Sequence, residues 1–394
     1  MFKDHVFYLP SEWDLHPIFG YGNLNKLLHE NKFSTTPTEI GDALAEIKSK
    51  ITNAHSNLMS VAKQAGVSAM TVSRVLNHPG KVADTTREKV QEVIDSLGYV
   101  PNLAANTLRR KRSGVVVAMV PTIDNSVFSD TIQGISDVLE LAGYQLLLGC
   151  ASYSPEKEQT LMKAFLGHRP DGIILTGTLH TPETRKMLIQ TGVPIVEMWD
   201  NSDDHLDMAV GFDNFRAGHE ITRHMIDYGY TNIGYIGGNP KHEANENRAA
   251  KRSKGLYAAF QDAKLSKPVR WNVLDPLNVS ECGIIAADFV MENPDLDAII
   301  CANEIIGVGA IRELQRRGKS VPNDIAISGI GDANIAALVS PGLTTIRFHG
   351  RSIGQRSAEL LLGRLNNLDF TEDRVDIGFE LVLRGSTSFE KPWN

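Results

Sequence analysis

Cysteine is scarce in this chain, and long hydrophobic runs are absent. Only three cysteines occur in 394 residues, Cys150, Cys282 and Cys301, and none has metal-ligand spacing. This argues against a disulfide framework and a zinc site and predicts core thiols in a reducing compartment. No run approaches the ~20 apolar residues that cross a bilayer, and the first residues lack the basic-then-apolar order of a secretory signal. We therefore expect a cytoplasmic protein without a membrane partner.

Recognisable catalytic motifs are also missing. The sequence has no P-loop and no nucleophile elbow, and its twelve histidines show no His-Glu-x-x-His or paired spacing. The segment Gly329-Ile330-Gly331-Asp332 lacks the full glycine fingerprint of a nucleotide site and predicts a strand-to-helix turn instead. An enzyme is therefore the weaker alternative, and we predict no catalytic residue, no metal and no cofactor.

Charge is distributed unevenly along the chain. The formal net charge of −7 would argue against a nucleic-acid partner if it were spread evenly. However, residues 58–113 contain nine basic and four acidic residues, which leaves this segment at +5 and the remainder at −12. A basic segment within an acidic chain indicates a local surface for DNA.

The pattern of the sequence divides it into four regions. We expect residues 1–57 to be a poorly ordered extension with one plausible amphipathic helix near its end, residues 58–100 a head, and residues 101–113 a linker. From residue 114 to residue 394, short apolar runs alternate with helix-length amphipathic stretches, and the alternation restarts after about residue 213. Such alternation predicts doubly wound parallel sheets, here in two α/β lobes in series with a ligand cleft between them. The expected strands are 115–120, 144–149, 172–176, 193–196, 232–236, 298–301 and 325–328.

The segment 58–77, LMSVAKQAGVSAMTVSRVLN, has the spacing of a helix-turn-helix. Ala62 is a small residue where two helices would cross, Gly66 lies in the turn, and β-branched Val72 would pack the second helix. Ser68 can cap that second helix.

The exposed side of the second helix is the predicted recognition face. Arg74 can donate two hydrogen bonds to guanine O6 and N7, while apolar Ala69 and Met70 suit thymine methyl groups. The alternative is that the serines and threonines merely cap and solvate a small helix pair, but a third helix predicted over 84–97 argues against it. Polar residues of the same segment fit phosphate contacts: Ser68, Thr71, Ser73 and Asn77.

These motifs resemble those of the LacI family of transcriptional regulators. The resemblance is carried by AKQAGVSAMTVSRVLN, by GYVPN after the third helix, and by the basic segment before the strand at Gly114-Val115-Val116, and it extends from about residue 58 to the C-terminus. It implies an all-α helix-turn-helix head, a hinge helix over 101–113, and a two-lobed α/β core like that of periplasmic sugar-binding proteins. The implied partners are double-stranded operator DNA and a small effector, and a homodimer is expected because such heads read palindromic half-sites.

In this family the hinge helix orders on the operator and wedges a leucine into the minor groove. The matching residue here is Leu108, followed by Arg109. A wedge costs a few kcal/mol of unstacking and gains a bent site that contacts more protein. Because a short helix is marginal alone, it can act as a switch. The alternative interpretation of Leu108 is a core residue.

Residues of the core resemble the effector contacts of the family. Amides and carboxylates bind vicinal hydroxyls, and an arginine pairs with a carboxylate in bidentate fashion, which suits a sugar acid. The family usually carries Asp where Glu304 stands, Asp213 could instead cap the following helix, and Trp199 could be ordinary core. The implied effector contacts are Asp213, Arg252, Asn303 and Glu304, with Asn125 and Phe128 after the first strand and Trp199 as an apolar wall.

Within the family, His180-Thr181-Pro182, the stretch 192–198 and the stretch 206–214 resemble repressors of gluconate utilisation. This resemblance implies a repressor of sugar-acid catabolism that gluconate releases from its operator, with 2-ketogluconate, idonate, a neutral sugar or a purine as alternative effectors. A periplasmic sugar-binding protein would share the core, but it predicts a signal sequence and no basic head. The sequence has no terminal leucine heptad, so a coiled-coil tetramer is not implied.

Overall fold

The computed structural model describes residues 57–99, 112–123, 126–237, 247–266, 268–272, 279–368 and 372–388. The chain divides into two compact units, Met1–Leu103 and Ala104–Asn394. The extension predicted for residues 1–57 lies outside the described residues except for Asn57, and so do Leu108 and Arg109 of the predicted hinge helix and Asn125 of the core.

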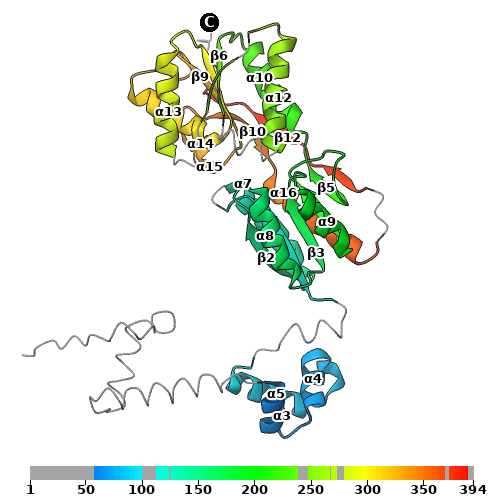
Figure 1. Ribbon diagram of the computed structural model, residues 1–394. Coiled ribbons are helices and arrows are strands. Elements are labelled where there is room, and N and C mark those ends of the chain that lie inside the picture. The colour runs from blue at the N-terminus through cyan, green and yellow to red at the C-terminus, as the bar shows by residue number, and fades with distance from the viewer. Residues whose placement is uncertain are drawn as a thin grey trace, which may run out of the picture. The chain divides into compact units, whose positions relative to one another are not determined.

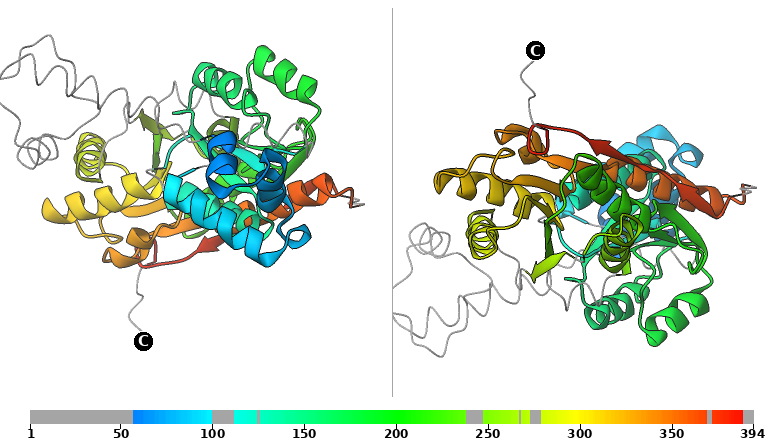
Figure 2. Two further views of the ribbon diagram at one scale, coloured as in Figure 1. Left: turned by 90° about the horizontal axis from the view of Figure 1, so that it is seen from below. Right: turned by 90° about the horizontal axis from the view of Figure 1, so that it is seen from above.

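Three short helices form the head. They are α3 (Leu58–Ala65), α4 (Ala69–Asn77) and α5 (Asp84–Leu97), with a single 3-10 turn, η1 (Pro79–Lys81), before the last. Figure 2 (left) shows them in blue to cyan, packed against one another. The residues buried between them are apolar and recur at helical spacing: Val61, Ala62, Ala65, Val72, Val75, Val90 and Ile94.

Local sequence determines where the head helices begin and end. Asn57 and Ser60 form a capping box at the start of α3, and Gly66 ends this helix at φ +65°, a left-handed conformation that glycine adopts without steric cost. Ser68 caps α4 through a hydrogen bond from the backbone N–H of Thr71. The helix-turn-helix predicted from Ala62, Gly66 and Val72 is confirmed, as Ala62 and Val72 are buried.

The first lobe of the core contains a six-stranded parallel sheet in the order β11-β5-β4-β3-β1-β2. Side chains alternate between its faces, so that Ile173 and Leu175 pack in one apolar cluster while Ile174 packs in another. Helices α7 (Ser126–Leu141) and α16 (Gly350–Leu365) pack against each other, and α8 (Pro155–Leu166) packs against α9 (Pro182–Thr191). The strands are β1 (Val115–Val120), β2 (Gln145–Cys150), β3 (Gly172–Thr176), β4 (Ile195–Met198), β5 (Met208–Gly211) and β11 (Arg374–Asp376).

The second lobe repeats this architecture with the sheet order β12-β10-β9-β8-β6-β7, in which only β12 runs antiparallel to its neighbour. Helix α10 packs on α12, and α13 packs on α14 (Figure 1). The strands are β6 (Ile233–Gly237), β7 (Val269–Asn272), β8 (Ala298–Cys301), β9 (Ala326–Ile330), β10 (Thr344–Phe348) and β12 (Phe379–Val382). The helices are α10 (Asn214–Asp227), α12 (Asn247–Asp262), α13 (Val279–Glu292), α14 (Glu304–Arg316) and α15 (Asn334–Leu338).

The predicted fold class is confirmed, but the two lobes are not strictly in series. After β10 of the second sheet, the chain returns to the first lobe for α16 and β11, and then crosses again to β12. The sequence pattern gives the type and order of elements, whereas sheet membership depends on contacts between residues far apart in the chain. The segment 329–332 forms the predicted turn, since β9 ends at Ile330 and α15 begins at Asn334.

Helix α16 connects the crossover to the start of the core. It begins at Gly350, directly after the strand that leaves the second lobe, and a Cβ on its Gly354 would lie 2.0 Å from the carbonyl oxygen of Thr131 in α7. The two helices therefore touch at their backbones. At its other end, the carbonyl of Leu365 accepts a 2.5 Å hydrogen bond from the guanidinium of Arg112.

Candidate functional site

Helix α4 presents a continuous exposed face. Met70 is 69% exposed, and Arg74, one helical turn later, is also exposed. Residues four apart lie on the same side of a helix, so both side chains project from one surface. Ala69 beside them is half-buried. This arrangement of one long cation next to apolar groups matches the predicted recognition face.

The polar residues of the same helix have internal partners. The hydroxyl of Ser68 lies 2.9 Å from that of Thr71, and it also accepts the backbone N–H of Thr71. The Asn77 amide donates to the carbonyl of Ser73 at 2.8 Å. These hydrogen bonds hold the side chains in place on α4. A hydroxyl that already takes part in one hydrogen bond can still make another. Their predicted phosphate contacts therefore stay a prediction.

The core contains a cavity at the carboxyl ends of the first three strands of the first lobe. Its wall includes Val120 at the end of β1, Tyr153 after β2, and Thr178 after β3. Such strand ends are where open α/β sheets bind ligands. Arg248, from the first turns of α12 in the second lobe, completes the wall.

Arg248 is one of the residues of this cavity that the sequence analysis did not predict. It is only 4% exposed, and its guanidinium lies 5.6 Å from the ring centroid of Phe128 in α7. Phe128, predicted as an effector contact, lies under this cation but does not line the cavity. Arg248 lies four residues before Arg252 and thus on the same helix face. That spacing is the signal that could have found it.

Trp199 combines an unusual backbone with an unsatisfied polar atom. Its φ is +71°, a region that a bulky residue rarely adopts, and such strain often marks a functional position. The side chain is 3% exposed and packs edge-on against Phe128, Phe212 and Phe348. Within the described part of the chain, its buried indole N–H has no hydrogen-bond partner. The residue is thus part of the core and also holds a donor that a ligand could satisfy.

Arg252 and Asp213, two further predicted effector contacts, lie beside this aromatic cluster. Arg252 donates to the side-chain oxygen of Asn214 at 2.7 Å, and the Asn214 amide donates to the carbonyl of Trp199 at 3.0 Å. Asp213 caps α10 by accepting from the backbone N–H of Arg216 at 3.0 Å, as the alternative interpretation predicted. Neither side chain lines the cavity that contains Arg248.

Helix α12 also contacts the first lobe through an ion pair. The Lys251 ammonium lies 2.6 Å from a carboxylate oxygen of Asp200, which follows β4 and is buried. Together with the contact between Arg248 and Phe128, this pair makes one face of α12 the wall that the second lobe presents to the first.

Asn303 and Glu304 lie at the start of α14. Asn303 caps the helix by accepting the backbone N–H of Ile306 at 2.9 Å, and Glu304 is buried. Burial, together with the nearby charge of Asp332, raises the pKa of Glu304 to about 7. Neither residue lines the cavity described above, so their predicted effector contacts stay a prediction.

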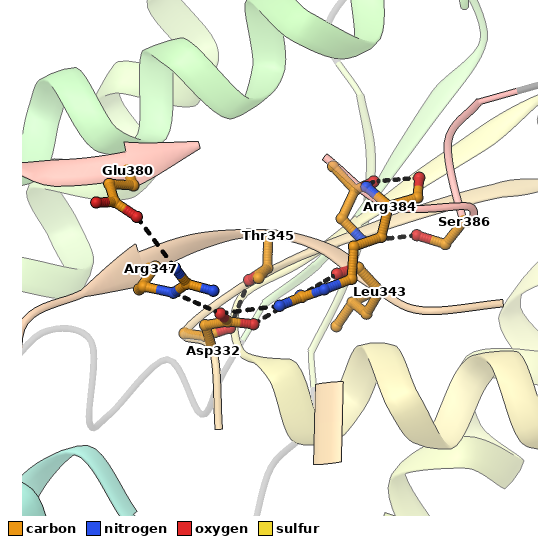
Figure 3. A network of polar contacts seen from close by, with 9 residues as sticks. Asp332, Leu343, Thr345, Arg347, Glu380, Arg384 and Ser386 are labelled. Atoms are coloured by element: carbon orange, nitrogen blue, oxygen red, sulfur yellow. Dashed lines mark hydrogen bonds and ion pairs between the residues drawn. The ribbon is translucent and has the colours of Figure 1, made fainter. Parts of the chain in front are cut away.

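Asp332, next to Glu304, belongs to a network of charged residues (Figure 3). Its carboxylate accepts hydrogen bonds from Arg347 at 2.8 Å and from Arg384 at 2.6 Å, and Arg347 also pairs with Glu380 at 3.1 Å. Burial raises the pKa of Asp332, but these two guanidinium groups lower it further, to below its ordinary value. The network ties the turn after β9 to β10 and β12, the two strands beside the crossovers.

The raised pKa of Glu304 predicts how the stability of the core depends on pH. Its folded pKa is raised, so unfolding releases a proton between pH 4.5 and 7, and the stability of the core falls as the pH rises through this window. We expect Glu304→Gln to leave stability unchanged at pH 5 and to raise the free energy of unfolding by about 1–2 kcal/mol at pH 8. Urea unfolding followed by circular dichroism at the two pH values measures this.

Glu313 on the same helix provides a control of opposite sign. Hydrogen bonds from Arg316 and Arg317 lower the pKa of Glu313 to about 2. Glu313→Gln should therefore lower stability at pH 8, by a small amount because its partner Arg316 is exposed to solvent. An equal response of the two variants would contradict the assignment of a protonated Glu304.

The described residues offer neither a metal site nor a membrane segment. No group of three or more His, Cys, Asp or Glu side chains among them is placed to hold a metal ion. No helix in the same part of the chain is long and apolar enough to span a bilayer.

Comparison with known proteins identifies both units. Residues 57–102 match the model for bacterial regulatory proteins of the lacI family, and residues 222–387 match the model for a periplasmic binding protein-like domain. The transcriptional regulator GntR of Escherichia coli K12 is 36% identical over 331 residues, which are 84% of this chain and 98% of the relative. The regulator IdnR of the same organism is 31% identical over 335 residues, with the same coverage.

The solved structures agree with these relatives. A LacI-family regulator from Silicibacter pomeroyi superimposes with a TM-score of 0.80 and 30% identity, covering 85% of this chain and all of that one. The GntR regulator of Chromobacterium violaceum superimposes with a TM-score of 0.65 and 35% identity, covering 69% of this chain and 99% of that one. All of these relatives are named as transcriptional regulators and none as an enzyme, as the sequence predicted.

Proposed function

Because the chain belongs to the LacI family of bacterial transcriptional regulators, we propose that it is a repressor whose operator affinity is controlled by gluconate or a closely related sugar acid. Its head supplies the DNA contacts, with Arg74 and Met70 on the exposed face of α4 reading base edges in the major groove. Its core supplies the effector site. We expect two copies to act together, since heads of this type read palindromic half-sites.

The observation that carries the effector proposal is the position of Arg248. Within the described residues it is the cationic side chain that lines the cavity, and it is almost wholly buried. A guanidinium removed from water binds a carboxylate strongly, because two parallel hydrogen bonds add to the charge attraction. The cavity therefore favours an acid over a neutral ligand.

The motifs of the first lobe narrow the choice of acid. His180-Thr181-Pro182 and the stretches 192–198 and 206–214 resemble those of gluconate-utilisation repressors, and the similarity to the GntR regulators of two organisms supports the same choice. Hydroxyl-binding groups stand near Arg248, including Thr178 and Ser154 on the cavity wall. A linear polyhydroxy acid provides both the carboxylate and the hydroxyls that such a wall can bind.

The test is a gel shift on the DNA upstream of the protein's own coding sequence, with and without gluconate. We expect a salt-sensitive complex with a palindromic site and its loss in gluconate. Calorimetry against gluconate, 2-ketogluconate, idonate, ribose and a purine then identifies the effector. Binding of ribose or the purine alone would overturn the sugar-acid proposal, and the absence of any sequence preference would overturn the DNA contacts proposed for α4.

A further inference from the structure

A buried histidine between two glutamates lies directly behind the cavity. The imidazole of His180, in the loop before α9, is fully buried. Its Nδ1 lies 2.7 Å from Oε1 of Glu158 in α8, and its Nε2 lies 3.0 Å from Oε1 of Glu197 in β4. We call Glu158, His180 and Glu197 the buried triad. Its members come from three different elements, so the fold of the first lobe brings them together.

The charge of the triad follows from this geometry. Burial lowers the pKa of His180, but hydrogen bonds and charge attraction from Glu158 and Glu197 raise it further, to about 9. His180 is thus protonated at neutral pH and can donate from both ring nitrogens. Each ring nitrogen faces one glutamate oxygen, so the imidazolium can hold both side chains by charged hydrogen bonds.

Glu158 can accept a further hydrogen bond more readily than Glu197 can. Glu197 is fully buried, and its other oxygen accepts the backbone N–H of Leu206. Glu158 retains 10% exposure of its side chain and lines the cavity. In the described part of the chain, His180 is the partner of the Glu158 carboxylate, through Oε1. Glu158 is therefore the member of the triad that can accept a hydrogen bond from a ligand.

We propose that Glu158 is a specificity residue for the effector, accepting a hydrogen bond from a ligand hydroxyl, and that His180 and Glu197 are positioning residues that fix its carboxylate. This inference rests on the proposed function, because it concerns the same cavity. Arg248 and Glu158 lie on the wall of one cavity with opposite charges. Glu158 would repel the acid group of a ligand, so the carboxylate binds at Arg248 and a hydroxyl at Glu158. The ligand class is a polyhydroxy acid bound in one orientation.

A purely structural role explains the triad less well. Three ionisable groups taken out of water cost more than apolar side chains of the same volume, so a buried ion triad is weak support for stability. A carboxylate held by a charged donor is, by contrast, a rigid acceptor that needs little reordering when a ligand binds. The placement of the least buried member on the cavity wall agrees with the second explanation.

The experiment measures, by calorimetry on the full chain, the affinities of gluconate and of its 3-, 4-, 5- and 6-deoxy analogues. We expect the wild type to discriminate against one analogue about 10- to 100-fold, which is the value of a hydrogen bond to a charged group. Glu158→Ala should weaken the binding of gluconate by a similar factor and abolish the discrimination against that one analogue. His180→Gln should reduce the same discrimination without changing the ranking of the other analogues.

Two controls separate recognition from folding. Glu158→Gln keeps the shape of the side chain and an amide oxygen as acceptor, so it should retain part of the discrimination. Glu183→Ala removes an exposed carboxylate from the first turn of α9, the neighbouring helix, and should change no affinity. Thermal unfolding of each variant confirms that it is folded.

The outcomes distinguish this inference from the proposed function. If the wild type binds neither gluconate nor any related acid, the effector proposal fails, and the role of Glu158 fails with it. If the wild type binds gluconate but folded Glu158→Ala keeps the affinity and the pattern of discrimination, only the role of the triad is refuted. A uniform loss for all analogues in His180→Gln would also refute positioning, because it indicates general damage to the cavity.

Discussion

Replacing Arg248 by alanine should weaken the binding of gluconate about 1,000-fold while leaving the affinity for operator DNA unchanged in the absence of effector. The side chain is 4% exposed on the wall of the cavity, so a carboxylate bound to it is removed from water. Truncating one partner of such a pair costs 2–5 kcal/mol or more, and each 1.4 kcal/mol is tenfold in affinity. The variant should therefore remain on its operator at gluconate concentrations that release the wild type.

Two further variants make the Arg248 result specific. Lys254→Ala removes an exposed positive charge from the same helix, α12, and should behave like the wild type. Arg248→Lys should bind gluconate with intermediate affinity, because an ammonium keeps the charge but cannot form two parallel bonds. Titration calorimetry and a gel shift on the same preparations measure both properties. If folded Arg248→Ala still binds gluconate within threefold of the wild type, the acid group binds elsewhere.

Replacing Arg74 by alanine should weaken the specific operator complex about 10- to 100-fold and leave binding to scrambled DNA nearly unchanged. Arg74 is exposed on α4 beside Met70, in the position from which a guanidinium reaches the guanine edge. A good bidentate contact to a base is worth about 1–3 kcal/mol of discrimination. Fluorescence anisotropy with an operator duplex and a scrambled duplex, at several salt concentrations, measures both affinities and their salt dependence.

Arg87 provides the matched control for Arg74. It lies on α5 and pairs with Asp84 at 2.7 Å, so Arg87→Ala removes one positive charge from the head without altering the face of α4. We expect it to reduce both affinities by the same small factor, if at all, and to keep their ratio. Should Arg74→Ala show this same behaviour, Arg74 contacts phosphate and not a base.

The parts of the structure that sequence predicted well are those that local chemistry determines. The strands 115–120, 172–176 and 298–301 were predicted with the observed limits, because each is a continuous apolar run between turns. The helix over 84–97 also has its predicted limits, since Gly98 ends it in a left-handed conformation. These features need no knowledge of distant residues.

The parts that sequence did not predict depend on contacts over long distances. Strand β11 has only three residues, too few for a periodic signal, and its place beside β5 follows from the return of the chain to the first lobe. Arg248 and Glu158 are 90 positions apart and carry no motif, yet both line one cavity. Phe128 was predicted as an effector contact and Trp199 as an apolar wall, and the two rings pack together at 5.3 Å between centroids.

Helix α16 connects the crossover between the lobes to the start of the core. The helix starts at the crossover between the lobes, contacts the backbone of α7 in its first turns, and ends where the carbonyl of Leu365 accepts a hydrogen bond from Arg112. Sixteen residues of helix span ~24 Å, so a tilt of about 10° at the crossover displaces the far end by about 4 Å. Arg112 lies within the predicted hinge segment, 101–113, and is the first described residue after residue 99. We therefore expect a closure of the two lobes to move Arg112, and with it the predicted hinge segment, by several ångströms.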